Sequence, residues 1–473
     1  MTEHPVRVHP GGWNRGLAWF VGLELLCVAG SFVMLRMGQT RMATACLLGP
    51  FQLLMWSMLL SSGQALLAAF TVLLPLAGAG LLPYTYERFV FMPGTVMLLC
   101  LSALTSYLFA ARPDRVRLRA SEWFPLLAIG IWTIASGLNA TTHGWGCPFL
   151  LLMTLVAIQV MLLAYFFATV PRSLTDMRTL LYAVVATAVL VAFCVPFLQA
   201  SSGGFGALGG KMVDTPFGTV NLNTIGYVLG PISAVALGMA VGARRRRTRL
   251  LLWSAVFVCA LVLVLTKSRG AWLGFAAAFI YITARKRSLA LLVSAAAFCL
   301  AILLSDVLRA LFVSRAAATT AYDPSLLGRF VLWSYAWHIG KANWLLGVGM
   351  ENFRYVKQLL GFPMPLKVGL DFNAHNIYLE TFVDLGVVGL ALFLWMLVSS
   401  FIRSLRAAGT ADAGDLGLGL SAGIAAYAAH GLFDCVLFQP GVFALLALLV
   451  GLSASLRRLA GVSPVPHQVL RVS

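Results

Sequence analysis

One histidine and two arginines carry the side chains best suited to chemistry in this sequence. Arg269 begins the return of a short hairpin, Arg329 lies in a long segment between apolar runs, and His375 immediately precedes an apolar run. Histidine titrates near neutral pH and is the usual side chain for proton transfer. Arginine offers fixed, bidentate donors for phosphate oxygens. Together they indicate displacement of a phosphate-type leaving group, with His375 accepting the proton.

Further polar residues are expected to support these three. The supporting candidates are Asn376, Glu380, Asp384, His430, Asp434 and Lys211. No HExxH, DxD or Walker A motif is present, and Phe205 and Met212 break the phosphate-loop pattern around Lys211. We therefore expect neither a metal nor a cofactor.

The same residues also have purely structural interpretations, which the sequence leaves open. Arg269 would suit an interfacial anchor whose charged end reaches toward water. Arg329, with Trp333 and Trp337 at spacings of four, would suit an amphipathic helix lying on lipid headgroups.

Two further structural interpretations concern the later candidates. Asn376 would suit the N-cap of the helix that follows. His430 and Asp434, at positions i and i+4, fit a satisfied buried pair on one helix face.

The composition determines what kind of protein must position these groups. Of 473 residues, 60% are hydrophobic and 11% are charged, whereas a soluble domain carries about 25% charged residues. This excludes a soluble enzyme, a DNA-binding domain and a disordered tail, and indicates a polytopic membrane protein. The eight cysteines show no metal-ligand spacing, and seven of them lie within apolar stretches.

Apolar runs of roughly 20 residues predict the membrane spans. The fourteen candidates are 16–35, 42–60, 64–82, 89–111, 123–138, 148–170, 180–200, 224–242, 249–266, 270–284, 289–304, 378–401, 416–436 and 440–457. Several of them are short, and the first three have the weakest boundaries. No small-residue cleavage site follows the first run, so we expect a retained anchor there.

The net charge of +18 is explained by the loops rather than by nucleic acid, because cytoplasmic loops of membrane proteins are enriched in Lys and Arg. With the N-terminus inside, the clusters at 112–119, 172–178, 244–249, 285–287, 403–406 and 457–458 all become cytoplasmic. The opposite loops at 139–147 and 201–223 then carry only Lys211 as a formal cation. Arg36 and Arg41 do not fit this pattern, so the first hairpin is the least certain span.

Segment 305–377 interrupts the alternation of spans and short loops. It is far longer than the other loops and rich in aromatic residues, as expected of a folded external domain. We predict a helix over Ser325–Asn343 and a second one over Met350–Leu360 that ends at Gly361. The predicted organisation is an N-terminal transmembrane region 1–304, a loop domain 305–377 and a C-terminal transmembrane region 378–473.

In this topology the candidate groups gather at the external face, whereas the middles of the spans are nearly free of charge apart from Glu24. A secondary transporter would place its polar groups near the midplane. We therefore favour an enzyme acting at the external surface. A transporter or flippase for an amphipathic lipid remains the alternative from another class.

Several short motifs around the long loop resemble the O-antigen ligase and polymerase superfamily of bacterial envelope glycosyltransferases. Each is short, and their order is the specific feature. They are Lys267-Ser268-Arg269-Gly270, Gly328-Arg329 followed by Trp333, Gly347–Phe353, Ala374–Glu380, Asp384–Leu390 and His430–Asp434. The resemblance covers about 220–440.

The resemblance implies an all-α polytopic membrane protein of the GT-C type with about twelve transmembrane helices, up to fourteen here, and one long helical periplasmic loop. It implies a metal-independent, inverting transferase in the bacterial inner membrane, with its active site facing the periplasm and both termini cytoplasmic. The family pattern places the essential histidine at His375 and the arginines at Arg269 and Arg329.

The resemblance also implies the partners, which are an undecaprenyl-diphosphate-linked glycan as donor, membrane lipids, and no nucleic acid. The folded, aromatic loop looks more like the ligase, which uses a lipid A–core acceptor. An O-antigen polymerase and a protein O-oligosaccharyltransferase remain the alternatives within the superfamily.

Overall fold

The computed structural model describes residues 120–145, 154, 160–161, 163–201, 212–215, 218–287, 291–293, 324–363, 373–435 and 440–461. All of them belong to one compact unit of the chain. The four expected spans before residue 120, most of 289–304 and the candidate Lys211 lie outside the described residues.

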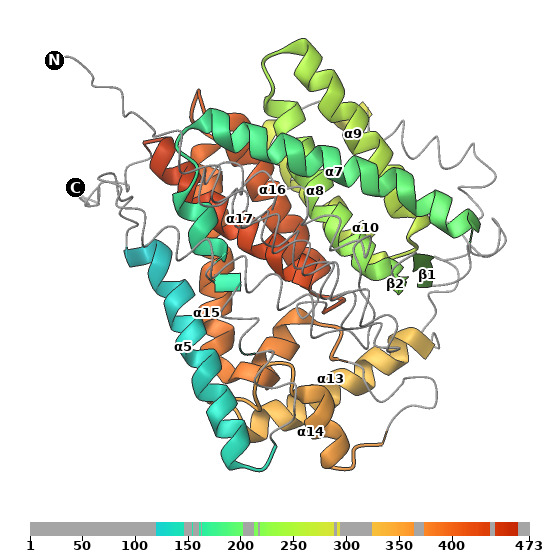
Figure 1. The fold of residues 1–473 in the computed structure, drawn as a ribbon, viewed down its shortest axis with the longest axis vertical. Helices are drawn as coiled ribbons and strands as arrows, with labels where there is room; N and C mark the ends of the chain where they lie inside the picture. The colour runs from blue at the N-terminus through green and yellow to red at the C-terminus, as the bar shows by residue number, and fades with distance from the viewer. Residues whose placement is uncertain are drawn as a thin grey trace, which may run out of the picture. The chain divides into compact units, whose positions relative to one another are not determined.

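The described residues form helices and one small hairpin (Figure 1). The helices are α5 (Ala120–Thr142), α7 (Leu174–Ser201), α8 (Leu222–Gly242), α9 (Arg246–Leu265), α10 (Arg269–Lys286), α13 (Pro324–Ala342), α14 (Phe353–Leu359), α15 (Ile377–Ala407), α16 (Gly414–His430) and α17 (Pro440–Leu459). Strands β1 (Met212–Thr215) and β2 (Gly218–Asn221) pair antiparallel between α7 and α8.

The hairpin is a small addition to the all-α fold expected for this part of the chain. Its strands contain β-branched residues, which favour extended backbone: Val213, Thr215, Thr219 and Val220. Its four-residue strands are shorter than the helices on either side, and the fold is otherwise helical in the part of the chain that the structure describes.

Six of the described helices are long and apolar enough to cross a membrane: α5, α7, α8, α9, α15 and α17. Each coincides with an expected span. Helices α10 and α16 also lie on expected spans, but α16 ends at His430 rather than at residue 436. The polytopic membrane architecture is therefore confirmed for this part of the chain.

Burial divides the spanning helices into central and peripheral ones. Their most apolar stretches are 89% buried in α8 and 83% in α17, but only 39–50% in α5, α7, α9 and α15. The peripheral helices expose large apolar side chains such as Leu138, Phe193, Leu251 and Val398. So much exposed apolar surface on helix faces is expected where lipid rather than water surrounds the protein.

The closest helix packing joins α8 to α16, and it depends on glycine. A Cβ added to Gly238 would lie 2.6 Å from the Cα of Gly419, so the two backbones touch at this point. Small residues at such crossings let helices approach closely in membranes, where van der Waals packing replaces the hydrophobic driving force. Helix α10 packs against the same two helices.

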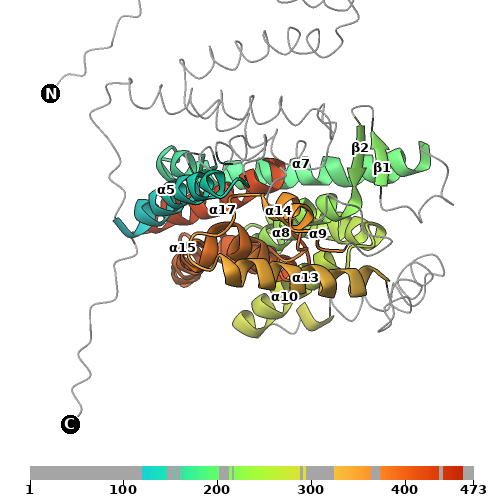
Figure 2. The ribbon, with the colours of Figure 1, turned by 90° about the horizontal axis from the view of Figure 1, so that it is seen from below.

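The two helices expected within the long loop are present as α13 and α14. Both contact α15, and α13 crosses it where Gly340 meets the ring of Phe382. Figure 2 shows α13 and α7 on opposite sides of α8. The loop has a small apolar core of its own against α15, formed by Ala336, Ile339, Val348, Phe353, Val356, Ala374 and Val383.

Helix α15 is interrupted at Gly386, whose φ of 70° and ψ of −173° are not helical. The interruption releases backbone carbonyls, and neighbouring elements bind them. Val348 N–H donates to Val383 O at 3.0 Å and Gly349 N–H to Asp384 O at 2.9 Å. A Cβ at Gly386 would lie 2.0 Å from Leu345 O, so only glycine fits there.

Helix α5 binds the same interruption from its other side. Ser136 Oγ donates to Asp384 O at 2.7 Å, and Trp132 Nε1 donates to Leu385 O at 2.8 Å. Figure 1 shows α5 running beside α15, with α13 and α14 near one end of the pair. The loop, α5 and α15 are therefore interlocked at this point.

Candidate functional site

His375 lies in a short extended segment just before α15, with its backbone in the left-handed region at φ 47°. A non-glycine residue there is strained by about 1–3 kcal/mol, and such strain is found mainly at functional sites. Its N–H donates to Asn373 Oδ1 at 2.9 Å, and Asn373 Nδ2 donates to Cys435 O at 2.6 Å. The surrounding hydrogen bonds thus fix the backbone at His375.

Asn376 is the N-cap of α15, as its type and position predicted. Its Oδ1 accepts hydrogen bonds from the N–H groups of Tyr378 at 2.9 Å and Leu379 at 3.0 Å. Its Nδ2 donates to Leu432 O at 3.0 Å, and Ile377 N–H donates to Gly431 O at 2.8 Å. Besides capping α15, Asn376 and its neighbour Ile377 therefore connect segment 373–377 to the segment that follows α16.

The side chain of His375 is bonded to a carboxylate. Its Nδ1 lies 2.9 Å from Oδ1 of Asp434, which also accepts the N–H of Cys435 at 2.9 Å. An ionised carboxylate can only accept hydrogen bonds, so Nδ1 carries a proton, and in the neutral imidazole Nε2 then carries the lone pair. The His375 side chain is 20% exposed and that of Asp434 only 4%. The buried carboxylate of Asp434 thus orients the partly exposed imidazole of His375.

His430 and Asp434 do not form the hydrogen-bonded pair that their spacing allowed. Helix α16 ends at His430, and the turn that follows directs Asp434 to His375 instead. The His430 ring stacks on Tyr227 with centroids 3.9 Å apart and planes 16° apart. Neither ring nitrogen of His430 has a hydrogen-bond partner within the described residues.

Glycine brings the first turn of α10 against His430. A Cβ on Gly270 would lie 2.6 Å from its Cδ2 and 2.8 Å from its Nε2. Arg269 directly precedes Gly270 as the first residue of α10, after the N-cap Ser268. The backbone that carries Arg269 is thus packed beside His430 and the turn leading to Asp434.

Arg329 approaches the same region from the loop. It lies in the second turn of α13 and is partly buried, and its charge interacts with both His430 and Asp434. Three elements that are distant in sequence therefore meet here: α10 packs its first turn against His430, α13 carries the charge of Arg329 that acts on His430 and Asp434, and the segment before α15 carries His375. The joint binding of a diphosphate by Arg269 and Arg329 stays a prediction.

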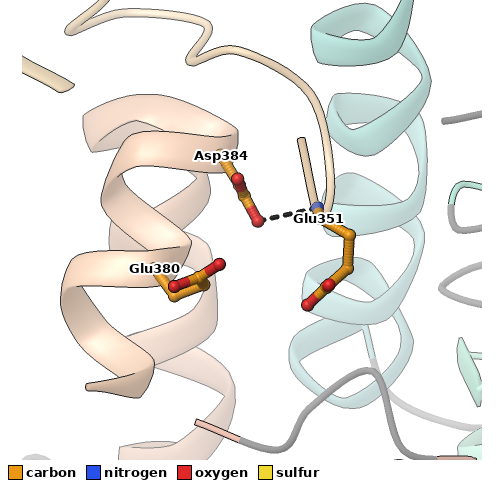
Figure 3. Close-up of side chains that lie close together, drawn as sticks. All are labelled: Glu351, Glu380 and Asp384. Carbon is orange, nitrogen blue, oxygen red and sulfur yellow. Dashed lines mark hydrogen bonds between the residues drawn. The ribbon is translucent and has the colours of Figure 1, made fainter. Parts of the chain in front are cut away.

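Glu380 and Asp384 lie in the first two turns of α15, as expected, and are buried with a third carboxylate, Glu351 (Figure 3). Asp384 accepts the N–H of Glu351 at 2.7 Å and of Phe353 at 3.2 Å. Glu380 Oε2 accepts the N–H of Ala374 at 2.5 Å. Both carboxylates thus bind the backbone of loop segments.

One oxygen from each of these three acids lies within 4.8 Å of the other two, which is close enough for a shared cation. Protein cations already lie beside the cluster. Arg354 Nη2 is 3.0 Å from Glu351 Oε2, and the buried Lys357 acts electrostatically on Glu351 and Glu380. The expectation of a metal-free site stays a prediction, and this cluster is the place to test it.

The pKa of Glu351 is raised from 4.5 to about 8 because burial disfavours its charged form. The positive charges of Arg354 and Lys357 oppose this shift, and the negative charge of Glu380 adds to it. Near neutral pH the Glu351 carboxyl is thus largely protonated, which reduces the negative charge of the cluster.

Sequence reasoning missed three features of this site. It missed the pairing of His375 with Asp434, the role of Asn373 in holding His375, and Glu351 as the third acid. An Asx turn could have been suspected from Asn373 two residues before His375. Nothing in the local sequence indicated that Glu351 has a left-handed backbone with φ 59°.

The chain was also compared with known protein families. Residues 254–394 match the model of the O-antigen ligase family, which supports that family assignment. The matched segment includes Arg269, Arg329 and His375, whereas Asp434 lies beyond it. No curated protein matches the chain.

Proposed function

We propose that this protein, with its O-antigen ligase family match over residues 254–394, is an O-antigen ligase. It transfers a glycan from an undecaprenyl-diphosphate donor to a hydroxyl of a lipid A–core acceptor on the periplasmic side of the inner membrane. The single observation that carries the proposal is the hydrogen bond from His375 to Asp434, in a region that α10 and α13 supply with arginines.

In this reaction His375 is the general base. The acceptor hydroxyl loses its proton to Nε2 of His375 while its oxygen forms a bond to the anomeric carbon. The bond from that carbon to the diphosphate oxygen breaks on the opposite face, so the anomeric configuration inverts. Asp434 stabilises the imidazolium that forms and keeps the proton of the resting histidine on Nδ1.

Arg269 and Arg329 stabilise the leaving group. Negative charge develops on the departing diphosphate, so donors already aimed at it contribute more in the transition state than in the ground state. By analogy with the loss of one oxyanion-hole donor, removing either guanidinium raises the barrier by about 2.7–4 kcal/mol. No step requires a metal ion, because two arginines supply the positive charge.

The backbone around His375 supports this role because its position is fixed before substrate binds. Segment 373–377 is bonded to Leu432, Gly431 and Cys435. Holding a base in its productive geometry lowers the entropic part of the barrier. In this proposal the strained φ of His375 serves to hold the base in that geometry.

The test is transfer by the purified protein in lipid vesicles that contain a polyprenyl-diphosphate-linked oligosaccharide and a lipid A–core acceptor. His375→Ala should reduce product formation to a small residual rate. The matched control is His338→Ala, because His338 lies exposed on α13 with Nδ1 bonded only locally to Ser334 O among the described contacts. Normal transfer by His375→Ala would rule out this site.

The acceptor is tested in the same vesicles. Product on lipid A–core supports the ligase, whereas extension of the polyprenyl-linked glycan would identify a polymerase, and product on protein hydroxyls would identify a protein O-oligosaccharyltransferase. Movement of the donor across the membrane without a new glycosidic bond would identify a transporter instead.

A further inference from the structure

Glu380 has no direct part in the reaction described above, yet it is bonded to the residue before the base. Its Oε2 accepts the N–H of Ala374 at 2.5 Å, reaching back past the N-cap Asn376. Glu380 is 2% exposed and Ala374 is fully buried in the apolar core of the loop. This hydrogen bond therefore fixes the chain immediately before His375.

The backbone of His375 requires such a restraint. At φ 47° it occupies a conformation that an unrestrained chain would leave for the β or α region. The N–H of Ala374 bonds to Glu380, and the N–H of His375 bonds to Asn373. Loss of the Glu380 carboxylate removes one of these two restraints and lets the imidazole move relative to Asp434.

One turn further along α15, Asp384 restrains a second segment of the loop through hydrogen bonds to its backbone. It accepts the N–H groups of Glu351 and Phe353, and Glu351 is also left-handed at φ 59°. Two carboxylates on one face of α15 thus hold two strained segments, and Figure 3 shows the three acids facing one another.

Helix α14 supplies counter-charge to this cluster. Arg354 pairs with Glu351 at 3.0 Å, and both Arg354 and Lys357 act electrostatically on Glu380. Lys357 is fully buried, with Nζ 5.1 Å from the ring centroid of Phe353. Docking of α14 onto α15 thus places two cations close to the acid that restrains His375.

We propose that Glu380 is a positioning residue that holds His375 in its active geometry, and that docking of α14 stabilises it in that role. The inference rests on His375 being the base of the proposed reaction. A buried carboxylate without nearby positive charge is strongly disfavoured, so the hydrogen bond to Ala374 depends on the loop cations. The loop and the base are thereby coupled through one side chain.

The test uses Glu380→Ala and Glu380→Gln, each alone and combined with His375→Ala, in the vesicle transfer assay. Glu380→Ala should lower kcat roughly 10- to 100-fold, because a small misplacement of a catalytic group has effects of this size. Glu380→Gln keeps an oxygen that can accept the Ala374 N–H, so it should recover most of the lost rate. In the His375→Ala background, Glu380→Ala should cause no further loss of the residual rate.

Thr381→Val is the matched control, because Thr381 is buried in the same turn and its Oγ1 donates only within α15, to Ile377 O at 2.7 Å, among the described contacts. It should leave kcat unchanged. Melting temperatures in detergent separate a loss of folding from a loss of positioning.

Three outcomes would overturn the proposal. The first is an equal loss from Glu380→Ala with and without His375, and the second is equal activity of the Ala and Gln variants. The third is loss of transfer on adding EDTA with recovery on adding Mg²⁺ or Ca²⁺, because the acids would then bind a metal. If the wild-type protein makes no product, or His375→Ala transfers normally, it is the proposed function that fails.

Discussion

Asp434 Oδ1 lies 2.9 Å from His375 Nδ1, although the two residues are 59 positions apart in the chain. The contact exists because α16 ends at His430 and the turn after it brings Asp434 to the segment before α15. The same turn accepts hydrogen bonds from that segment through the backbone carbonyls of Gly431, Leu432 and Cys435. The base and its carboxylate are therefore positioned by two helix ends that meet.

Asp434→Asn should lower kcat between roughly 100-fold and 10⁴-fold while protein yield stays normal. The amide has nearly the same size but cannot stabilise the imidazolium, and its NH₂ group can favour the wrong tautomer of His375. Initial rates of glycan transfer in vesicles measure the effect. Asp412→Asn, at an exposed position, is the control, and a rate for Asp434→Asn equal to that control would contradict the assigned role.

Arg329→Ala should reduce kcat/KM for the lipid-linked donor by a factor that corresponds to about 2.7–4 kcal/mol. Arg329→Lys should recover only part of this, because an ammonium keeps the charge but not the bidentate geometry. Arg406→Ala removes an exposed arginine at the other end of α15 and serves as the control. Full recovery by lysine would show that only the charge matters.

Gly386→Ala should lower the melting temperature in detergent by about 2 °C or more. A loss of 1 kcal/mol corresponds to about 2–4 °C in a domain of 150–250 residues and to less in a longer chain, and strain together with a clash against backbone costs more than that. Its φ of 70° strains any residue with a Cβ, and that Cβ would lie 2.0 Å from Leu345 O. Gly130→Ala is the control, because a Cβ there meets no atom within 4 Å and α5 is helical around it. Equal melting temperatures for the two variants would refute the interlock at α15.

The stability of the loop should fall as pH rises from about 4.5 to about 8. The pKa of Glu351 is raised from 4.5 to about 8 by burial, so within this window the folded state keeps a proton that the unfolded state has lost. Glu351→Gln stays neutral and should remove most of this dependence. Melting curves between pH 5 and pH 8.5 measure it, and parallel pH profiles for the two proteins would contradict it.

Much of the fold follows from local sequence. Apolar runs located α5, α7, α8, α9, α15 and α17, because a span needs about 20 apolar residues in succession. The loop helices α13 and α14 and the cap at Asn376 were likewise predicted from turn and capping signals. Such features depend on neighbouring residues, which the sequence shows directly.

The site was only partly predictable, because its contacts join distant segments. A four-residue spacing of His430 and Asp434 suggested one helix face, but the helix ends at the first of them. Gly431 was the only local signal for the helix end, and the four-residue spacing itself gave none. In the same way, Glu380 and Asp384 were identified as candidates, while their joint contact with Glu351 depends on how the loop folds back onto α15.

The interruption at Gly386 has a mechanical consequence for α15. The carbonyls freed there accept hydrogen bonds from Val348, Gly349, Ser136 and Trp132. The turns from Ile377 to Leu385 are thereby attached to the loop and to α5. Just beyond the interruption, Val387 N–H donates to Trp344 O at 2.7 Å, so the loop also holds the start of the second half of α15. A bend at Gly386 would therefore break bonds to the loop or to α5, so the angle between the two halves of α15 is set by its neighbours.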